Sequence, residues 1–301
     1  MSFISKALER AKALQHKREK PVAPPPSEIP ILSPPLTPWE GTEGQLAPEE
    51  EIDYSFTRTV PVNKETQRRY KLINIAAGGP LVEEYKLLRT RVLQLTRGEG
   101  RNTLMVTGPL PKEGKTLTAI NLAISLSQEM SQTVLLVDAD LRVPAVSRYL
   151  GIPKGMGLAD HLVDGVPITE LLVHPEGISS LVVLPAGRSV VNPVELLSSP
   201  RMASLVRELK NYYRDRYVIF DLPPVLVYAD TLAFAPLVDG IILVVEAGRT
   251  SREDISRCLE MVKNFPVLGL VLNKARIQPK AYEYYHYAGP KQLTSKIPWL
   301  K

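Results

Sequence analysis

Short apolar runs alternate with amphipathic segments along the chain from about residue 73 onward. Each run has the length of a buried strand, and each amphipathic segment has the spacing of a helix that covers a sheet. The predicted strands are 104–106, 134–137, 181–184, 217–221, 239–246 and 267–273. The predicted helices are 80–95, 117–130, 158–162, 193–197 and 252–265. This alternation predicts an α/β fold with a mostly parallel sheet, helices on both faces and ligands at the carboxyl ends of the strands.

The first twenty residues follow a different pattern. Apolar residues such as Phe3, Leu8 and Leu14 recur at helical spacing, so we predict an amphipathic helix over residues 1–20. Its other face is basic and carries Lys6, Arg10, Lys12, Lys17, Arg18 and Lys20. Two interpretations stay open: a docking helix for a partner or an anionic membrane surface, and a marginal helix that frays when isolated.

Residues 21–72 are rich in proline, glutamate and serine and show no hydrophobic periodicity. Such a composition buries too little apolar surface to offset the entropy of ordering, so we predict a disordered linker. The expected organisation is therefore a helix at 1–20, a linker at 21–72, a globular domain at 73–275 and a C-terminal tail at 276–301.

Composition excludes several other classes of protein. The chain is 44% hydrophobic and 23% charged, which is ordinary for a soluble α/β protein. Its single cysteine, Cys258, rules out a disulfide framework and favours a cytoplasmic location. No apolar run reaches the ~18 residues of a membrane span, so membrane attachment would require a partner. The net charge of +5 comes without a dense basic stripe, so we expect no nucleic-acid partner.

The segment between the first two predicted strands contains a phosphate-binding motif. Gly114-Lys115-Thr116 ends a turn rich in glycine and proline and precedes the helix 117–130. In such a loop the backbone N–H groups cradle phosphate, the lysine neutralises it and the threonine hydroxyl ligates Mg²⁺. The predicted cofactors are therefore ATP and Mg²⁺. The predicted phosphate-binding residues are Pro111, Lys112, Glu113, Gly114, Lys115, Thr116 and Leu117.

Acidic residues follow two of the other predicted strands. Asp138 and Asp140 come at the end of strand 134–137, and Asp221 ends strand 217–221. Carboxylates at these strand ends can complete a Mg²⁺ shell beside the loop. Arg142 is close enough in sequence to interact with the carboxylates or with phosphate. Loop and acids together predict a P-loop nucleotide-binding fold.

The helix 80–95 carries three charged residues at intervals of three. Glu83, Lys86 and Arg89 line one of its faces. They form either local salt bridges, which contribute little to stability, or a surface that pairs with a neighbouring subunit.

Four of the twelve tyrosines lie within six consecutive residues of the tail: Tyr282, Tyr284, Tyr285 and Tyr287. They could form an edge strand or an aromatic patch that packs on the domain. However, their surroundings are polar, with Pro279 and Pro290 on either side. We therefore favour the interpretation that this cluster is a phosphoacceptor for the nucleotide site.

Taken together, these residues resemble the bacterial tyrosine kinases (BY-kinases) that regulate capsule and exopolysaccharide synthesis. The resemblance covers roughly residues 75–289, and the opening residues 1–11 are similar to the subgroup encoded with exopolysaccharide and exosortase loci. Three motifs carry it: the loop ending Gly114-Lys115-Thr116, an apolar triplet followed by D-x-D-x-R at 135–142, and an apolar triplet followed by D-x-P-P at 218–224. The chain departs from the family pattern at three positions. Pro109 stands where the family has a small residue, Leu222 where it has Ser or Thr, and Lys86 where it has Arg.

The resemblance implies specific roles for the site residues. Lys115 would neutralise the β- and γ-phosphates, and Thr116, Asp140 and Asp221 would bind Mg²⁺. Asp138 would accept the proton of the incoming tyrosine hydroxyl, and Arg142 belongs to the same catalytic motif. The implied activity is autophosphorylation of the tyrosine cluster on a neighbouring subunit. Glu83, Lys86 and Arg89 correspond to the family's oligomerisation motif, with lysine in place of its first arginine.

The resemblance also implies partners. These are a membrane-embedded polysaccharide co-polymerase, or chain-length protein, that activates the kinase, and a tyrosine phosphatase that reverses it. The chain would then be cytoplasmic and recruited to the inner face of the membrane, and it would form a homo-oligomer through contacts between tail and active site.

Two alternatives come from other functional classes. A MinD/ParA-type ATPase is a positioning switch that modifies no tyrosine, and it carries a signature lysine four residues before the glycine of Gly-Lys-Thr. Leu110 stands there in this chain, and Lys112 is two residues away. The other alternative is a nucleotide-binding scaffold without kinase activity, which only an activity measurement would exclude.

Overall fold

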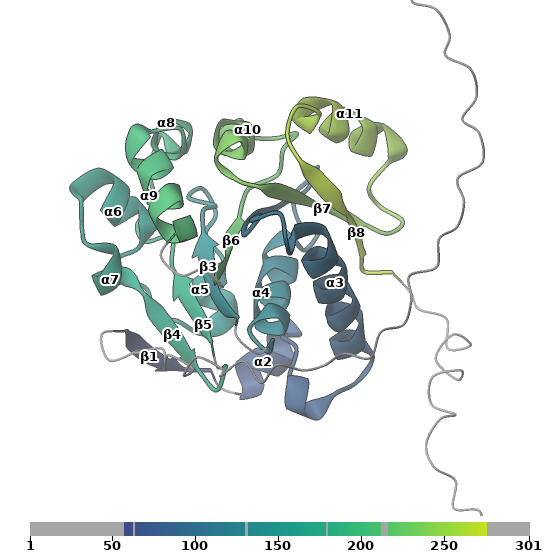
Figure 1. The fold of residues 1–301 in the computed structure, drawn as a ribbon, viewed down its shortest axis with the longest axis horizontal. Helices are drawn as coiled ribbons and strands as arrows, with labels where there is room; N and C mark the ends of the chain where they lie inside the picture. Colours follow the sequence, from purple (N-terminus) through teal and green to yellow (C-terminus); the bar gives the residue numbers. More distant parts are fainter. Residues whose placement is uncertain (1–56, 63, 130–131, 179, 212–215, 276–301) are drawn as a thin grey trace, which may run out of the picture. The chain divides into compact units, whose positions relative to one another are not determined.

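The computed structural model describes residues 57–62, 64–129, 132–178, 180–211 and 216–275 (Figure 1). The predicted helix 1–20, most of the predicted linker and the tail 276–301 lie outside these residues. The strands are β1 (Arg58–Pro61), β2 (Thr103–Thr107), β3 (Thr133–Asp138), β4 (Val173–Glu176), β5 (Leu181–Leu184), β6 (Arg216–Asp221), β7 (Gly240–Glu246) and β8 (Val267–Asn273). All six predicted strands are confirmed within a residue or two.

The described helices surround this sheet. The α-helices are α2 (Lys64–Tyr70), α3 (Pro80–Thr96), α4 (Lys115–Leu126), α5 (Val146–Leu150), α6 (Leu158–Asp164), α7 (Ile168–Leu171), α8 (Pro193–Leu197), α9 (Pro200–Asn211), α10 (Asp230–Phe234) and α11 (Arg252–Val262). Two short 3₁₀ helices are η1 (Ile75–Ala77) and η2 (Ala235–Leu237). The five predicted helices are all present, and α4 ends four residues earlier than expected.

The strands form one sheet of eight in the order β1-β4-β5-β3-β6-β2-β7-β8. All neighbours pair in parallel except β4 and β5, which are antiparallel. The order places β3, β6 and β2 side by side at the centre, so the residues that follow these strands share one edge of the sheet. The predicted mostly parallel α/β sheet is confirmed, and its central edge is where the nucleotide motifs converge.

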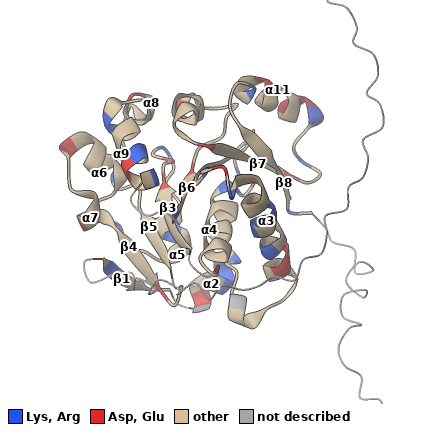
Figure 2. Cartoon of the chain, viewed as in Figure 1, with Lys and Arg blue, Asp and Glu red and all other residues tan. Residues whose placement is uncertain are grey.

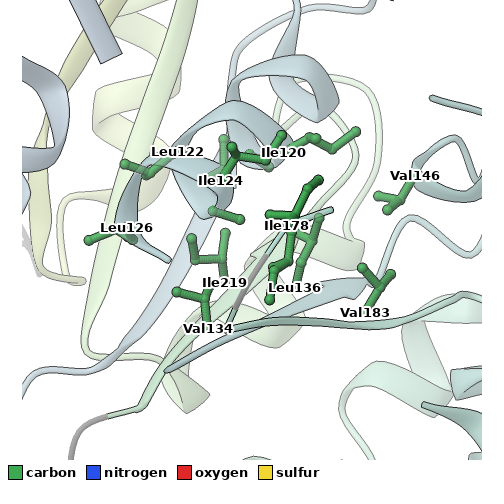
Figure 3. Close-up of a cluster of buried hydrophobic side chains, with 14 of the residues drawn as sticks. Ile120, Leu122, Ile124, Leu126, Val134, Leu136, Val146, Ile178, Val183 and Ile219 are labelled. Carbon is green, nitrogen blue, oxygen red and sulfur yellow. The ribbon is translucent and has the colours of Figure 1, made fainter. Parts of the chain in front are cut away.

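The sheet is buried on both faces because side chains along each central strand alternate between two cores. Leu104 and Val106 of β2 point into one core, and Met105 points into the other. Helices α3 and α4 cover the first core, shown in Figure 3, where Ile120 and Leu122 of α4 lie over the sheet. The second core is covered by α6, α9, α10 and α11. The P-loop helix α4 is therefore fixed against the sheet by its own apolar face.

The predicted linker extends too far toward the C-terminus. Residues 58–61 form β1, which pairs with β4, and residues 64–70 form α2. At the end of α2 the centre of the Tyr70 ring lies 4.7 Å from that of Tyr149, and after the helix Asn121 Oδ1 accepts a hydrogen bond from the Ile73 amide. Burial of a few side chains after the proline-rich stretch, rather than local composition, orders this segment. The globular region therefore begins before residue 73.

Charged residues lie mainly on the helices and at strand ends, and the strands are almost entirely uncharged along their length (Figure 2). In the described part of the chain, no helix combines the length and the apolar character that crossing a bilayer requires.

Candidate active site

The phosphate-binding loop lies between β2 and α4 and depends on two glycines. Gly114 adopts φ +96°, a left-handed conformation, and directly precedes the first turn of α4. Gly108 lies against β7, where a Cβ would come within 2.2 Å of the Val244 carbonyl oxygen. This close approach of two strands leaves no room for a side chain at 108 and so requires glycine there.

The loop is held in shape by a buried carboxylate. Glu113 is fully buried, and its side chain accepts hydrogen bonds from the Leu110 amide at 2.7 Å and the Thr250 hydroxyl at 2.6 Å. Its carbonyl oxygen accepts another from Asn273 Nδ2 at 2.8 Å. The Glu113 side chain therefore points into the protein interior. This leaves the backbone N–H groups of Glu113 and Gly114 available to bind phosphate. Leu117 likewise packs its side chain on the core.

Replacing Gly114 with alanine should weaken nucleotide binding about tenfold or more. Alanine would be strained at φ +96°, and its Cβ would lie 2.1 Å from Asn273 Nδ2, so the contact that holds the Glu113 carbonyl must break. Strain of this kind costs about 1–3 kcal/mol. Titration with a fluorescent ATP analogue measures the effect. Gly165→Ala, at φ +77° but without a close contact, is the matched control and should bind normally.

Lys115 lies at the start of α4 with its side chain largely buried. Its Nζ donates a hydrogen bond to the Leu110 carbonyl at 2.6 Å, across the mouth of the loop. Burial lowers the pKa of Lys115, and the neighbouring carboxylates of Glu113, Asp221 and Asp140 oppose this shift. The lysine is thus positioned between the loop and the acids, where a phosphate group would be neutralised.

Asp138 ends β3 and is completely buried. Its Oδ2 accepts hydrogen bonds from the amides of Ala145 and Val146, whereas Oδ1 has no partner in the described residues. Burial raises the pKa of Asp138 to about 7, with a further contribution from Asp140, and the two amides oppose the rise. A buried carboxylate with one oxygen free and a pKa near neutrality is suited to accept a proton.

Asp221 ends β6 and lies opposite Asp138 in the parallel register of β3 and β6. Both of its carboxylate oxygens are buried without a hydrogen-bond partner in the described part of the chain. Burial raises the pKa of Asp221 well above its usual range, Asp138 adds to the rise, and the Thr116 hydroxyl opposes it. A buried carboxylate without hydrogen-bond partners, beside a hydroxyl group, is better suited to binding a cation than to contact with solvent.

These residues fit Mg²⁺ only in combination with a nucleotide. No group of three or more His, Cys, Asp or Glu side chains in the described residues is arranged to hold a metal by itself. Mg²⁺ generally binds through one or two carboxylates, water and substrate phosphates. Thr116, Asp140 and Asp221 match that pattern, because phosphate oxygens would supply the remaining ligands.

Asp140 follows β3 and lies within electrostatic range of Lys115. Its Oδ1 accepts hydrogen bonds from the amides of Arg142 and Val143, so the turn after the strand is built around this carboxylate. Burial raises the pKa of Asp140, and these amides and Lys115 oppose the shift.

The guanidinium of Arg142 has a different partner from the one expected. It forms two hydrogen bonds to the fully buried Asp230, at 2.6 and 2.9 Å, and lies 4.6 Å from the centre of the Tyr228 ring. The hydrogen bonds to Asp230 raise the pKa of Arg142. Its side chain is thus fixed between β3 and the start of α10 and does not hydrogen-bond Asp138 or Asp140.

Sequence reasoning missed Asp230, Tyr228, Thr250 and Asn273. Asp230 lies 88 positions from Arg142, and Asn273 lies 160 positions from Glu113. No local motif links such pairs. The one available signal was that Asn273 ends a predicted strand, at the same sheet edge as the predicted acids.

Two of the three residues predicted for oligomerisation contact each other. Lys86 Nζ lies 2.7 Å from the Glu83 carboxylate, and Arg89 pairs with Glu129 at 3.0 Å while donating to the Ser125 carbonyl. Arg89 therefore joins α3 to the end of α4 within the chain. A role for these residues between subunits stays a prediction.

Comparison with known proteins identifies the family. The AAA domain family matches residues 113–274, which include Gly114-Lys115-Thr116 at the end of the loop, the acids and Asn273. The tyrosine-protein kinase YwqD of Bacillus subtilis is 34% identical over 216 residues, covering 71% of this chain and 89% of that protein. The chain belongs to the bacterial tyrosine-protein kinase family.

Other similar proteins share different portions of their length with this chain. The succinoglycan biosynthesis transport protein ExoP of Rhizobium meliloti is 33% identical over 69% of this kinase, which spans only 27% of ExoP. The solved structure of the VpsO kinase domain is 30% identical, with a TM-score of 0.57. The match covers 64% of this chain and 98% of the VpsO chain. The cell-division ATPase MinD of Pyrococcus furiosus, 22% identical with a TM-score of 0.50, shares the fold alone.

Proposed function

We propose that this kinase transfers the γ-phosphoryl group of ATP to tyrosines of its own C-terminal cluster. The observation that carries the proposal is the convergence of Lys115, Thr116, Asp138, Asp140 and Asp221 at one edge of the sheet. A phosphate site, buried carboxylate oxygens without hydrogen-bond partners on Asp138 and Asp221, and a raised pKa at Asp138 are what proton abstraction beside a nucleotide requires.

In the proposed reaction the tyrosine hydroxyl oxygen forms a bond to the γ-phosphorus while the bond from that phosphorus to the β-phosphate oxygen breaks. Asp138 accepts the hydroxyl proton on Oδ1, and ADP leaves with the electron pair. Lys115 stabilises negative charge on the phosphates, and backbone N–H groups of residues 111–117 orient them. Bound Mg²⁺ supplies further charge neutralisation, with Thr116, Asp140 and Asp221 as its protein ligands.

The acceptors are Tyr282, Tyr284, Tyr285 and Tyr287 of a neighbouring copy. Added phosphates make the cluster strongly negative, which favours its release from a site that already contains several carboxylates. We propose that this cycle regulates export of an exopolysaccharide, that a membrane-embedded co-polymerase recruits and activates the kinase at the inner face of the membrane, and that a tyrosine phosphatase resets it. The similarity to ExoP, a succinoglycan biosynthesis transport protein, supports the polysaccharide context.

The ATPase-switch alternative is less well supported. Leu110 occupies the position of its signature lysine. The Leu110 carbonyl oxygen accepts a hydrogen bond from Lys115, and the Leu110 amide donates one to the Glu113 carboxylate. The loop therefore uses this residue to position the catalytic lysine through its backbone. A non-catalytic scaffold would have no need of an unpartnered buried oxygen on Asp138.

Mass spectrometry of the purified full chain after incubation with MgATP tests this function. We expect phosphotyrosine within residues 282–287, and we expect it to disappear when all four tyrosines are replaced by phenylalanine. Hydrolysis of ATP without phosphotyrosine anywhere in the chain would support the ATPase switch. Nucleotide binding without either reaction would support the scaffold.

A further inference from the structure

A cavity of about 380 Å³ lies at the end of the sheet opposite the nucleotide site. It is formed where the central strands β2, β3 and β6 begin, whereas the active-site acids lie where β3 and β6 end. Its lining comes from the end of α3, the following loop, the end of α9 and the start of β6. The residues are Thr96, Arg97, Gly98, Gly100, Arg101, Asn102, Gln132, Lys210, Asn211, Arg216 and Tyr217.

The charged groups at this cavity are mostly positive. Arg97, Arg101, Lys210 and Arg216 line it, and no acidic side chain does so among the described residues. Two neutralising contacts lie beside it: Arg101 pairs with Glu99, and Lys210 pairs with Asp239. Among the described side chains, this leaves uncompensated positive charge at Arg97. Arg97 is exposed and forms no ion pair within the described residues.

The cavity wall is fixed rather than collapsible. Asn102 Nδ2 donates to the carbonyl oxygens of Lys210 and Arg216, at 3.1 and 2.9 Å, and so joins α9 to β6. Asp239 Oδ2 accepts from the Asn102 and Thr103 amides, which fixes the start of β2. The Thr96 and Tyr217 hydroxyl groups are 2.7 Å apart.

We propose that this cavity is a second ligand site, separate from the P-loop, that binds a small phosphorylated molecule of the size of a sugar phosphate or mononucleotide. The guanidinium groups of Arg97 and Arg101 supply paired donors of the kind that bind phosphate, and Lys210 adds a further positive charge. The volume lies within the range of small-molecule sites, and the cationic side chains in the lining favour an anionic ligand. Gly98 and Gly100, with no atom within 4 Å of a hypothetical Cβ, leave the loop side open.

Calorimetric titration of the full chain tests the proposal. The P-loop is first saturated with Mg²⁺ and a non-hydrolysable ATP analogue, so that phosphate cannot bind there. Glucose 1-phosphate and uridine monophosphate are then titrated separately, with glucose as the uncharged control. We expect saturable binding of one or both phosphorylated probes and none of glucose. The stronger of the two probes identifies whether the sugar or the nucleoside is preferred.

Variants locate the site. Arg97→Gln combined with Arg101→Gln should weaken binding of the phosphorylated probe about tenfold or more, because hydrogen bonds to a charged group are lost. Both side chains are substantially exposed, so the fold should be retained. Arg207→Gln, on the exposed face of α9, is the matched control and should leave the affinity unchanged. Absence of saturable binding by both phosphorylated probes, equal binding of glucose, or unchanged affinity in the double variant would overturn the proposal.

Discussion

Replacing Lys115 with methionine is expected to lower the rate of tyrosine phosphorylation about 100-fold or more while the protein stays folded. Methionine keeps much of the aliphatic volume but removes the cation that lies between the loop and the three acids. Losing one preorganised electrostatic contact to developing charge costs on the order of 100- to 1000-fold in rate. The initial rate of phosphotyrosine formation at saturating MgATP measures the effect.

Lys263→Met is the matched control for this substitution. Lys263 follows α11 and pairs with Glu260 on the surface, away from the loop and the acids, so its loss should leave the rate unchanged. Thermal unfolding of both variants checks that the fold is intact. A Lys115→Met protein that is well folded and retains more than about a tenth of the activity would contradict the role given to this lysine.

Asp138→Asn is expected to abolish phosphorylation and, in the absence of nucleotide and Mg²⁺, to stabilise the protein. The asparagine side-chain carbonyl can still accept hydrogen bonds from the amides of Ala145 and Val146. Its NH₂ group takes the place of Oδ1, which has no hydrogen-bond partner in the described residues. The substitution removes a buried carboxylate close to Asp140 and Asp221. It therefore replaces a buried proton acceptor with a neutral group of similar size.

The stabilisation should grow with pH. The pKa of Asp138 is raised from 3.8 to about 7 on folding. Between these values the folded chain holds a proton that the unfolded chain releases, so the stability of the wild-type protein falls as pH rises toward 7. Asparagine does not titrate. The difference in unfolding free energy between variant and wild type should increase by on the order of 2 kcal/mol from pH 5 to pH 8.

Urea denaturation of both proteins at the two pH values measures this difference. Asp164→Asn, which removes one carboxylate from the exposed surface of α6, controls for the change in net charge and should alter stability by less than about 0.5 kcal/mol. If Asp138→Asn were less stable than wild type at pH 8, the buried carboxylate would be contributing favourable contacts, and its assignment as a strained proton acceptor would fail.

The central fold was predictable because its signals are local. The apolar run at 134–137 and the acid after it identify both a buried strand and a site residue, and the same is true of 217–221. Because parallel strands place their carboxyl ends at one edge, the convergence of Asp138 with Asp221 followed from the pattern alone. The Gly-Lys-Thr turn then located the phosphate side.

The remaining features depend on contacts between distant residues. β1 was missed because only Val60 of its four residues is buried, so four residues after a proline-rich stretch carry almost no strand pattern. The bond between Arg142 and Asp230 and the Glu113 contacts with Thr250 and Asn273 join segments that only the folded sheet brings together. The fold brings these residues to the site from distant parts of the chain, and no local pattern in a single sequence indicates such contacts.

A mixing experiment tests the central claim most directly. The Lys115→Met chain, with its tail intact, is mixed with a chain in which Tyr282, Tyr284, Tyr285 and Tyr287 are phenylalanine, each with a different affinity tag, and radiolabelled MgATP is added. We predict label on the tail of the Lys115→Met chain in the mixture and on neither chain alone, with the wild-type chain labelled as the positive control. A wild-type chain that hydrolyses ATP but leaves no phosphotyrosine, alone or in any mixture, would contradict the assignment of this site as a tyrosine kinase.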